Sequence, residues 1–323
     1  HTLASYQKAI DDGADIIEPD LVSTKDGVLV ARHENEISGT TNVADVAAFS
    51  GRRTTKTIDG QSVTGWFTED FTLGELKTLR ARERIPSIRP DNVAYNDQFD
   101  IPTLDEIIAL ARDQSAKLGR NIGIYPETKH PTYFQSIGLP LEDRLIDGLR
   151  RDAFTASRTT VYIQSFEVAN LKAIRNKIGG SQPNWKLVQL MGTSGRQPYD
   201  FVVAKDSRTF GDMMTSQGMR DIAAYANGVG PDKSSIMGLD ANGKLTDPTD
   251  LIRNAHNAGL IVHPYTFRPE NTFLPPSLRS GADNTRNVNG SITEIQAFLR
   301  AGVDGFFTDD PAVGRQAVST FKR

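Results

Sequence analysis

The sequence predicts an α/β protein, specifically a TIM-like (β/α)8 barrel with one long insertion. From about residue 101 to the end of the chain, apolar segments of strand length alternate with segments of helical periodicity. This alternation indicates a parallel sheet whose strands are joined by helical crossovers. A length of 323 residues suits one barrel with an insertion, so we predict a single domain over residues 1–323.

The N-terminal part is predicted to begin with a helix and to continue with two strands. The helix covers residues 2–10, where apolar side chains have helical spacing, and Gly13 is well placed to end it. A strand over residues 15–22 follows. A turn then leads to a short strand over residues 28–31, which ends near His33.

Residues from about 38 to 100 form an irregular segment rich in Thr, Arg and Asp, with one helical fragment over 71–79. We interpret this segment as an insertion on a loop rather than as a separate folding unit. Connections of this length are usually functional. Within it, Trp66 and Phe67 either contact a ligand or fix the insertion to the barrel.

The remainder of the chain alternates between the two kinds of element. Helices are predicted over residues 103–118, 141–151, 167–177, 248–258 and 292–301. Strands are predicted over residues 122–126, 160–166, 186–191, 222–226, 260–265 and 304–308. Without the short strand over 28–31, the sequence shows seven principal strands, whereas a (β/α)8 barrel begins with a strand and needs eight. The first strand is therefore expected upstream of His1.

Composition excludes several classes of protein. The net charge of −3 gives no overall attraction to nucleic acid or to an anionic membrane. The absence of cysteine excludes disulfides, zinc–thiolate sites and thiol catalysis. No apolar run approaches the roughly 20 residues that span a bilayer, so stable membrane insertion is not expected.

Acidic residues lie at the C-terminal ends of two predicted strands, where TIM-barrel enzymes carry their chemistry. Glu18 and Asp20 are two residues apart, so both side chains project from one face of the first strand. They are either solvated charges or a buried pair that repels itself unless a cation intervenes. Glu127 repeats the arrangement on the next strand. Three oxygen ligands suit Ca²⁺ or Mg²⁺ better than zinc.

A lysine and a histidine complete the candidate site. Lys129 follows Glu127 by two residues and can meet a phosphoryl oxygen as a point charge, unless it is an ordinary solvated lysine. Among the five histidines, His33 is the best candidate for proton transfer, because a tight hairpin brings it near the strand that carries Glu18.

Other candidates are weaker. Four residues at or beyond other strand ends can line a pocket or simply pack the core: Gln164, Phe166, Tyr265 and Arg268. The remaining histidines are not assigned to the site: His130 and His256 are expected in solvent, His263 is expected in packing, and His1 has no assigned role.

Short segments in a familiar order cover the chain nearly end to end. They are Thr2-Leu-Ala-Ser-Tyr6, Gly13-Ala-Asp-Ile-Ile-Glu-Pro-Asp20, Thr24-Lys-Asp-Gly-Val28, Ala31-Arg-His33, Phe71-Thr-Leu-Gly-Glu-Leu76, Ile101-Pro-Thr-Leu104, Tyr125-Pro-Glu-Thr-Lys129, His263-Pro-Tyr-Thr-Phe-Arg268 and Phe307-Thr-Asp-Asp-Pro311. As a set they resemble the glycerophosphodiester phosphodiesterase family, and within it the larger periplasmic bacterial type.

The resemblance implies a TIM-like barrel in which Glu18, Asp20 and Glu127 match the divalent-metal ligands of the family. It also implies that His33 is the second of two catalytic histidines and that Lys129 is the lysine of a Glu-x-Lys motif. The irregular segment matches a family insertion that caps the substrate pocket.

Two features depart from the family pattern. His33 is followed by Glu34, where the family usually has Asp. The His-Arg-Gly motif of the family carries the first catalytic histidine and a phosphate-binding arginine, and it precedes the segment in which His1 lies. We therefore expect both of those residues upstream of His1.

The implied activity is metal-dependent hydrolysis of glycerophosphodiesters, such as glycerophosphocholine or glycerophosphoethanolamine, to glycerol 3-phosphate and an alcohol. The expected cofactor is one divalent cation, Ca²⁺ in preference to Mg²⁺. The expected partner is the small diester, with no nucleic acid, and the oligomeric state is left open. The resemblance also implies a periplasmic or secreted protein.

Two alternatives remain. The first is a lipid phosphodiesterase that resembles phospholipase D or sphingomyelinase D; the long insertion and the lack of cysteine argue against it. The second is a non-catalytic surface binding protein on the same barrel, which predicts erosion of the acidic residues or of Lys129. All of these residues are present.

Overall fold

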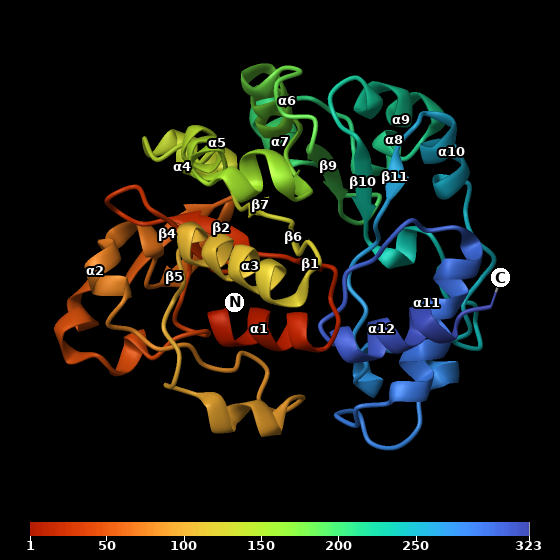
Figure 1. Ribbon diagram of the computed structural model, residues 1–323, viewed down its shortest axis with the longest axis horizontal. Coiled ribbons are helices and arrows are strands. Elements are labelled where there is room, and N and C mark those ends of the chain that lie inside the picture. Colours follow the sequence, from red (N-terminus) through yellow and green to blue (C-terminus); the bar gives the residue numbers. More distant parts are fainter. Residues whose placement is uncertain (323) are drawn as a thin grey trace. The chain divides into compact units, whose positions relative to one another are not determined.

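The computed structural model describes residues 1–322 of the chain (Figure 1). These residues divide into two compact units. The first comprises residues 1–11, 15–163 and 176–185, and the second comprises residues 12–14, 164–175 and those from 186 onward. Parallel strands and helices make up both units, as the sequence predicts. The prediction of one domain with an insertion stays a prediction.

Parallel strand pairs carry the acidic residues of the first unit. Its strands outside the insertion are β1 (Ile16–Ile17), β2 (Asp20–Ser23), β3 (Leu29–Ala31), β6 (Gly123–Ile124), β7 (Glu127–Thr128) and the first three residues of β8 (Val161–Ser165), whose last two residues belong to the second unit. β1 pairs with β6 and β2 pairs with β7, both in parallel, while β3 runs antiparallel to β2. β6 also pairs in parallel with β8 through Ile124 and Val161.

The two predicted strands that carry the acidic residues are each interrupted at a proline. Ile16 pairs with Gly123 and Asp20 with Glu127, so the register is the same on both sides of the interruption. This register places Pro19 opposite Pro126. Neither proline has an N–H to donate, but the strands remain bonded there: Tyr125 donates to the carbonyl of Ile17 and Glu127 to the carbonyl of Pro19, both at 2.9 Å.

Helices of the first unit are α1 (Leu3–Asp11), α2 (Leu73–Leu76), α3 (Leu104–Leu118), α4 (Pro131–Ser136) and α5 (Glu142–Arg151). The longest, α3, begins at Thr103, which exchanges two hydrogen bonds with Glu106 in a capping box, and it ends at the left-handed Gly119. α1 and α3 lie side by side (Figure 1). Short 3₁₀ helices cover Val43–Asp45, Ala47–Arg52, Thr68–Asp70 and Pro90–Tyr95, and a π-helix covers Phe154–Arg158.

The insertion contains a hairpin that the sequence analysis did not predict, formed by β4 (Thr54–Ile58) and β5 (Gln61–Gly65). Its turn consists of Asp59 and Gly60, both with positive φ (47° and 77°). Asp-Gly is a strong signal for such a turn. The two strands are polar and mostly exposed, so they lack the alternating apolar pattern from which a strand is predicted, and the hairpin was missed.

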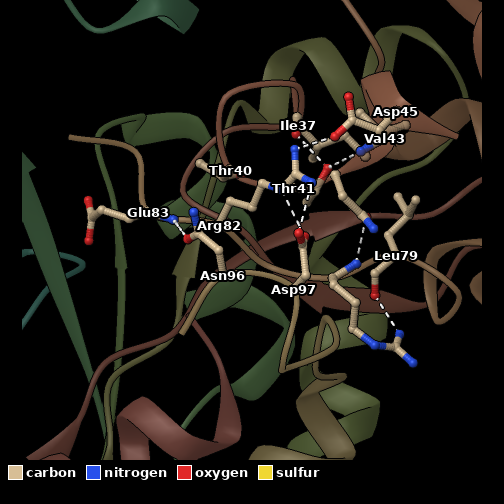
Figure 2. Close-up of polar contacts among 12 residues, drawn as sticks. Ile37, Thr40, Thr41, Val43, Asp45, Leu79, Arg82, Glu83, Asn96 and Asp97 are labelled. Atoms are coloured by element: carbon tan, nitrogen blue, oxygen red, sulfur yellow. Dashed lines mark hydrogen bonds and ion pairs between the residues drawn. The ribbon is translucent and has the colours of Figure 1, made fainter. Parts of the chain in front are cut away.

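Polar and apolar contacts hold the rest of the insertion together. The guanidinium group of Arg82 bridges the carboxylates of Asp45 and Asp97, at 2.5 and 2.8 Å (Figure 2). Trp66 donates a hydrogen bond from its indole to the carbonyl of Phe49 at 2.7 Å, and Phe67 is fully buried. Trp66 therefore packs within the insertion, and whether Trp66 and Phe67 contact a ligand or fix the insertion to the barrel stays a prediction.

Three parallel strands form the sheet of the second unit: β9 (Trp185–Met191), β10 (Gly228–Pro231) and β11 (Ile261–Val262), with β10 in the middle. The helices after β8 are α6 (Val168–Ile178), α7 (Tyr199–Ala204), α8 (Phe210–Met213), α9 (Ser216–Ala223), α10 (Leu251–Asn257), α11 (Val288–Ala301) and α12 (Pro311–Thr320). Short 3₁₀ helices cover Lys233–Ser235, Asn271–Phe273 and Pro276–Leu278.

The predicted strand over 222–226 is wrong. Ile222 lies on α9, a helix that begins after the N-cap Thr215 and buries Met219 on the same face. The strand is instead β10, whose sequence Gly-Val-Gly-Pro has too few apolar side chains to be recognised. Its glycines allow close strand packing, since a Cβ at Gly228 would lie 2.6 Å from Ile261 Cγ1.

The predicted strand over 304–308 is also only partly right. Thr308 forms an isolated parallel bridge with Phe267 instead of a continuous ladder. Phe267 nevertheless donates a backbone hydrogen bond to Phe307 at 2.8 Å, and Asp304 donates one to Val262 at 3.0 Å. Across residues 1–322, every helix is too short or too polar to cross a bilayer.

Two glycines test the role of close strand packing. Gly228→Ala should lower the free energy of unfolding by about 1–3 kcal/mol, because the added methyl group meets Ile261. Gly74→Ala is the matched control: nothing lies within 4 Å of its Cβ position, so it should be neutral or stabilise by up to about 1 kcal/mol. Urea unfolding of both variants measures the difference, and equal effects would contradict the packing argument.

Candidate active site

Strand register brings the predicted acidic residues together in the first unit. Asp20 on β2 and Glu127 on β7 are direct neighbours in the parallel ladder, so their side chains project on the same side. Glu18 lies two residues before Asp20 and shares its face. Asp20 and Glu127 are buried, and Glu18 is partly exposed. Asp20 and Glu127 are therefore not solvated charges at a strand end, which was the other interpretation of the sequence.

Burial and mutual repulsion separate the pKa values of these carboxyl groups. Burial, with the nearby charges of Asp20 and Glu127, raises the pKa of Glu18 well above its ordinary value. Burial also raises the pKa of Glu127, to about 8, with Asp20 adding to the effect and Lys129 opposing it. Burial acts in the same direction on Asp20, but Lys129 and His1 outweigh it and hold the pKa of Asp20 far below its usual range.

Lys129 provides the countercharge within the chain. Its Nζ lies 3.0 Å from Glu127 Oε1 and 4.0 Å from Asp20 Oδ1, and the side chain is buried. Burial opposes the positive charge, yet Glu127 and Asp20 outweigh burial and raise the pKa of Lys129. The ammonium group is therefore a fixed positive charge and not a solvated loop lysine.

His1 lies in the same site, although the sequence analysis gave it no role. Its Nε2 is 2.7 Å from Asp20 Oδ2 and its Nδ1 is 2.7 Å from the hydroxyl of Tyr6. Buried Arg32 donates a hydrogen bond to the carbonyl of His1 and helps to fix its position. A feature of the sequence could have identified it: His1 lies two residues before helix α1, and in a βα barrel the N-termini of helices lie at the same end as the C-termini of strands.

These residues fit a hard divalent cation. One ligand atom each from His1, Glu18 and Asp20 lies within 4.8 Å of the others. Glu127 is the direct neighbour of Asp20 on the adjoining strand. A buried cluster of carboxylates whose pKa values are raised by repulsion gains ionisation when a cation joins it. Carboxylate oxygens are the ligands that Ca²⁺ and Mg²⁺ prefer.

His33 follows β3 and is about half exposed. Its Nδ1 lies 2.8 Å from Glu34 Oε1, and each side chain is 46% exposed. His33 is close enough to Asp20 to help lower the pKa of that carboxyl group. The structure therefore brings His33 into the neighbourhood of the acidic residues, as the sequence analysis expected, and its catalytic role stays a prediction.

His130 is not in solvent, which corrects the expectation from the sequence. Its side chain is only 15% exposed, and its ring nitrogens lie 2.6 Å from Asp59 Oδ2 and 2.8 Å from Glu34 Oε2. Burial opposes protonation, but the two carboxylates outweigh it and raise the pKa of His130 to about 9. The sequence feature that could have identified His130 is its position directly before helix α4.

The predicted pocket-lining residues all lie in the second unit. The rings of Phe166 and Tyr265 meet edge to face with centroids 5.9 Å apart, and the Tyr265 hydroxyl donates to the carbonyl of Met191 at 3.0 Å. Arg268 pairs with Asp309 at 2.8 Å. Gln164 is buried on β8. A role for any of the four predicted residues in binding substrate stays a prediction.

The other two histidines behave as expected from the sequence. His256 on α10 is exposed and pairs with Asp304 at 2.9 Å. His263 is buried, and burial lowers its pKa to about 4. A histidine of this kind packs as a neutral side chain.

Known proteins resemble this chain over nearly its whole length. The model of the glycerophosphoryl diester phosphodiesterase family matches residues 1–313. The chain belongs to this family. The family and the enzyme class predicted from the sequence, a phosphoric diester hydrolase, are confirmed.

Individual relatives support the family assignment. Glycerophosphodiester phosphodiesterase GDPD6 of Arabidopsis thaliana is 35% identical over 320 residues, which cover 95% of this chain and 79% of the plant protein.

Solved structures share the fold. One from Silicibacter pomeroyi, described as a glycerophosphoryl diester phosphodiesterase, has a TM-score of 0.64 at 18% identity, covering 98% of this chain and 88% of that one. A phosphodiesterase from Oleispira antarctica in complex with the product sn-glycerol-3-phosphate has a TM-score of 0.56 at 15% identity, covering 99% and 91%. The predicted fold class, a TIM-like α/β barrel, is confirmed.

The raised pKa of Glu127 makes stability depend on pH. Between about pH 4.5 and 8 the folded protein keeps a proton on Glu127 that the unfolded chain releases. The unfolded state then binds fewer protons, so stability falls as pH rises through this range. In the presence of a chelator, the Tm should fall from pH 5.5 to pH 8.5, and Glu127→Gln should flatten the decline. Parallel declines in the two proteins would contradict the assignment.

Proposed function

We propose that the protein hydrolyses glycerophosphodiesters to sn-glycerol 3-phosphate and an alcohol, using a divalent cation. The observation that carries this proposal is the in-register pairing of Asp20 with Glu127, with Lys129 between their carboxylates. The relative from Oleispira antarctica is described with this product bound, which supports the same product here.

Three carboxylates would hold the cation: Glu18, Asp20 and Glu127. When bound there, a divalent cation would polarise the phosphoryl oxygens and stabilise the negative charge of the transition state. We propose Ca²⁺ in preference to Mg²⁺, because Ca²⁺ accepts more oxygen ligands in less regular geometry. His1, which bonds Asp20 at 2.7 Å, orients that carboxylate from the other side.

Lys129 and His33 supply the remaining chemistry. The ammonium group of Lys129 is permanently charged and can pair with a phosphoryl oxygen while it stays close to Glu127. His33 transfers a proton, either away from the attacking hydroxyl or to the departing alkoxide. Its exposure leaves the ring accessible to a substrate.

Metal dependence is tested with the full-length protein and glycerophosphocholine. Release of glycerol 3-phosphate should stop with chelator and return with Ca²⁺, and less completely with Mg²⁺. Asp20→Asn should lower kcat/KM on the order of 10²–10³-fold. Failure of the folded full-length protein to release product with any of these ions would falsify the proposed function.

The role of His33 is tested by His33→Ala, which should lower kcat by roughly 10²–10⁴-fold, the usual contribution of an acid/base group. The matched control is His256→Gln, which removes another histidine–carboxylate pair but lies on α10 in the second unit. The control should keep full activity. A His33→Ala variant as active as the control would exclude His33 from proton transfer.

A further inference from the structure

A line of polar contacts leads from His33 to the insertion. Glu34 uses both of its carboxylate oxygens: Oε1 lies 2.8 Å from His33 Nδ1, and Oε2 lies 2.8 Å from His130 Nε2. The other nitrogen of His130, Nδ1, lies 2.6 Å from Asp59 Oδ2. The order is therefore His33, Glu34, His130, Asp59, and every contact has hydrogen-bond geometry.

The partners of His130 determine its protonation. Both ring nitrogens face carboxylate oxygens, and an ionised carboxylate can only accept hydrogen bonds. Both nitrogens must then donate, which makes His130 an imidazolium cation. The raised pKa of His130 agrees with this reading of the geometry.

The same reasoning sets the tautomer of His33. The Oε1 of Glu34 accepts, so Nδ1 of His33 carries a proton, and Nε2 remains as the atom that takes up or gives away a proton. A carboxylate that holds one ring nitrogen in this way fixes both the orientation and the tautomer of a catalytic imidazole.

The backbone conformation fixes the positions of Asp59 and His130. Asp59 occupies the turn of the β4–β5 hairpin with φ 47°, and His130 has φ 49° directly before α4. Both side chains therefore project from sharply bent backbone, and one of them belongs to the insertion. Lys129 is the further charge facing Glu34, and it helps to keep that carboxylate ionised.

We propose that His130 is a positioning residue for His33: it holds the carboxylate of Glu34, which orients His33, and Asp59 of the insertion holds His130 in turn. This role rests on the proposed function, in which His33 transfers a proton. It gives the hairpin a part in assembling the active site.

Stability alone is a poor explanation for these contacts. Glu34 and His33 are each 46% exposed, and ion pairs at such exposure contribute only about 0–1 kcal/mol. Removing His33 or Glu34 should therefore leave the fold nearly unchanged, whereas His130 is only 15% exposed, so the Tm of its variants is measured beside their kcat. An effect on the reaction that is much larger than the effect on stability would separate positioning from structure.

The kinetic test compares His130→Gln with the matched control His256→Gln in the full-length protein. His130→Gln should lower kcat about 10–100-fold, the usual cost of losing a supporting hydrogen bond behind a catalytic group, with KM and Tm close to those of the control. In a His33→Ala background the same substitution should cost nothing further. A loss in that background equal to the loss in the parent would overturn the proposal.

Substitutions of Asp59 test the same role from the other end of the contacts. Asn and Gly both tolerate the positive φ of this position, so neither replacement strains the turn. Asp59→Asn keeps an acceptor for His130 and should retain more activity than Asp59→Gly, which removes it. Equal activities of these two variants would contradict a role for this contact.

Nuclear magnetic resonance separates the positioning role from the proposed activity. Imidazole ¹⁵N shifts at pH 7.5, with His33 assigned by its loss in His33→Ala, should show His33 protonated on Nδ1 and His130 protonated on both nitrogens. His130→Gln should shift His33 towards the other tautomer. Unchanged His33 shifts would refute the positioning role even if the enzyme is active, and altered shifts would support it even if no diester is hydrolysed.

Discussion

The ammonium group of Lys129 lies close to the carboxylates of Asp20 and Glu127, which strand pairing holds side by side. Asp20 and Glu127 have no freedom to separate, because their backbones are paired in register. Burying such a pair without a countercharge costs several kcal/mol for each ion. Lys129, at 3.0 Å from Glu127 and 4.0 Å from Asp20, offsets that cost. Even with this countercharge, burial and mutual repulsion keep the pKa values of Glu18 and Glu127 raised.

Much of this site follows from the sequence because it depends on strand periodicity alone. A spacing of two residues places Glu18 with Asp20, and Glu127 with Lys129, whatever the details of packing. Parallel pairing then needs only the right register to bring the two motifs together, and the opposed prolines interrupt the ladder without shifting it. The long helices could also be predicted from the sequence, because apolar periodicity and capping residues mark where they begin and end.

The features that were missed depend on contacts between distant segments. His1 and His130 belong to no local motif. Each lies at the start of a helix, His1 two residues before α1 and His130 directly before α4, at the end of the barrel where the strands end. β10 was missed because its sequence, Gly-Val-Gly-Pro, has no apolar pattern typical of a strand. Its glycines let the neighbouring strands approach closely. The β4–β5 hairpin was missed because its strands are polar, so that only its Asp59-Gly60 turn carried a signal.

The countercharge from Lys129 has a consequence for the order of assembly. Many small metal-binding domains fold only when the ion binds, and chelators unfold them. Here Lys129 supplies a positive charge from within the chain, so the strands can pair without a metal ion. Under the proposed function, folding and metal binding would then be separate events, and a chelator would remove activity without unfolding the protein.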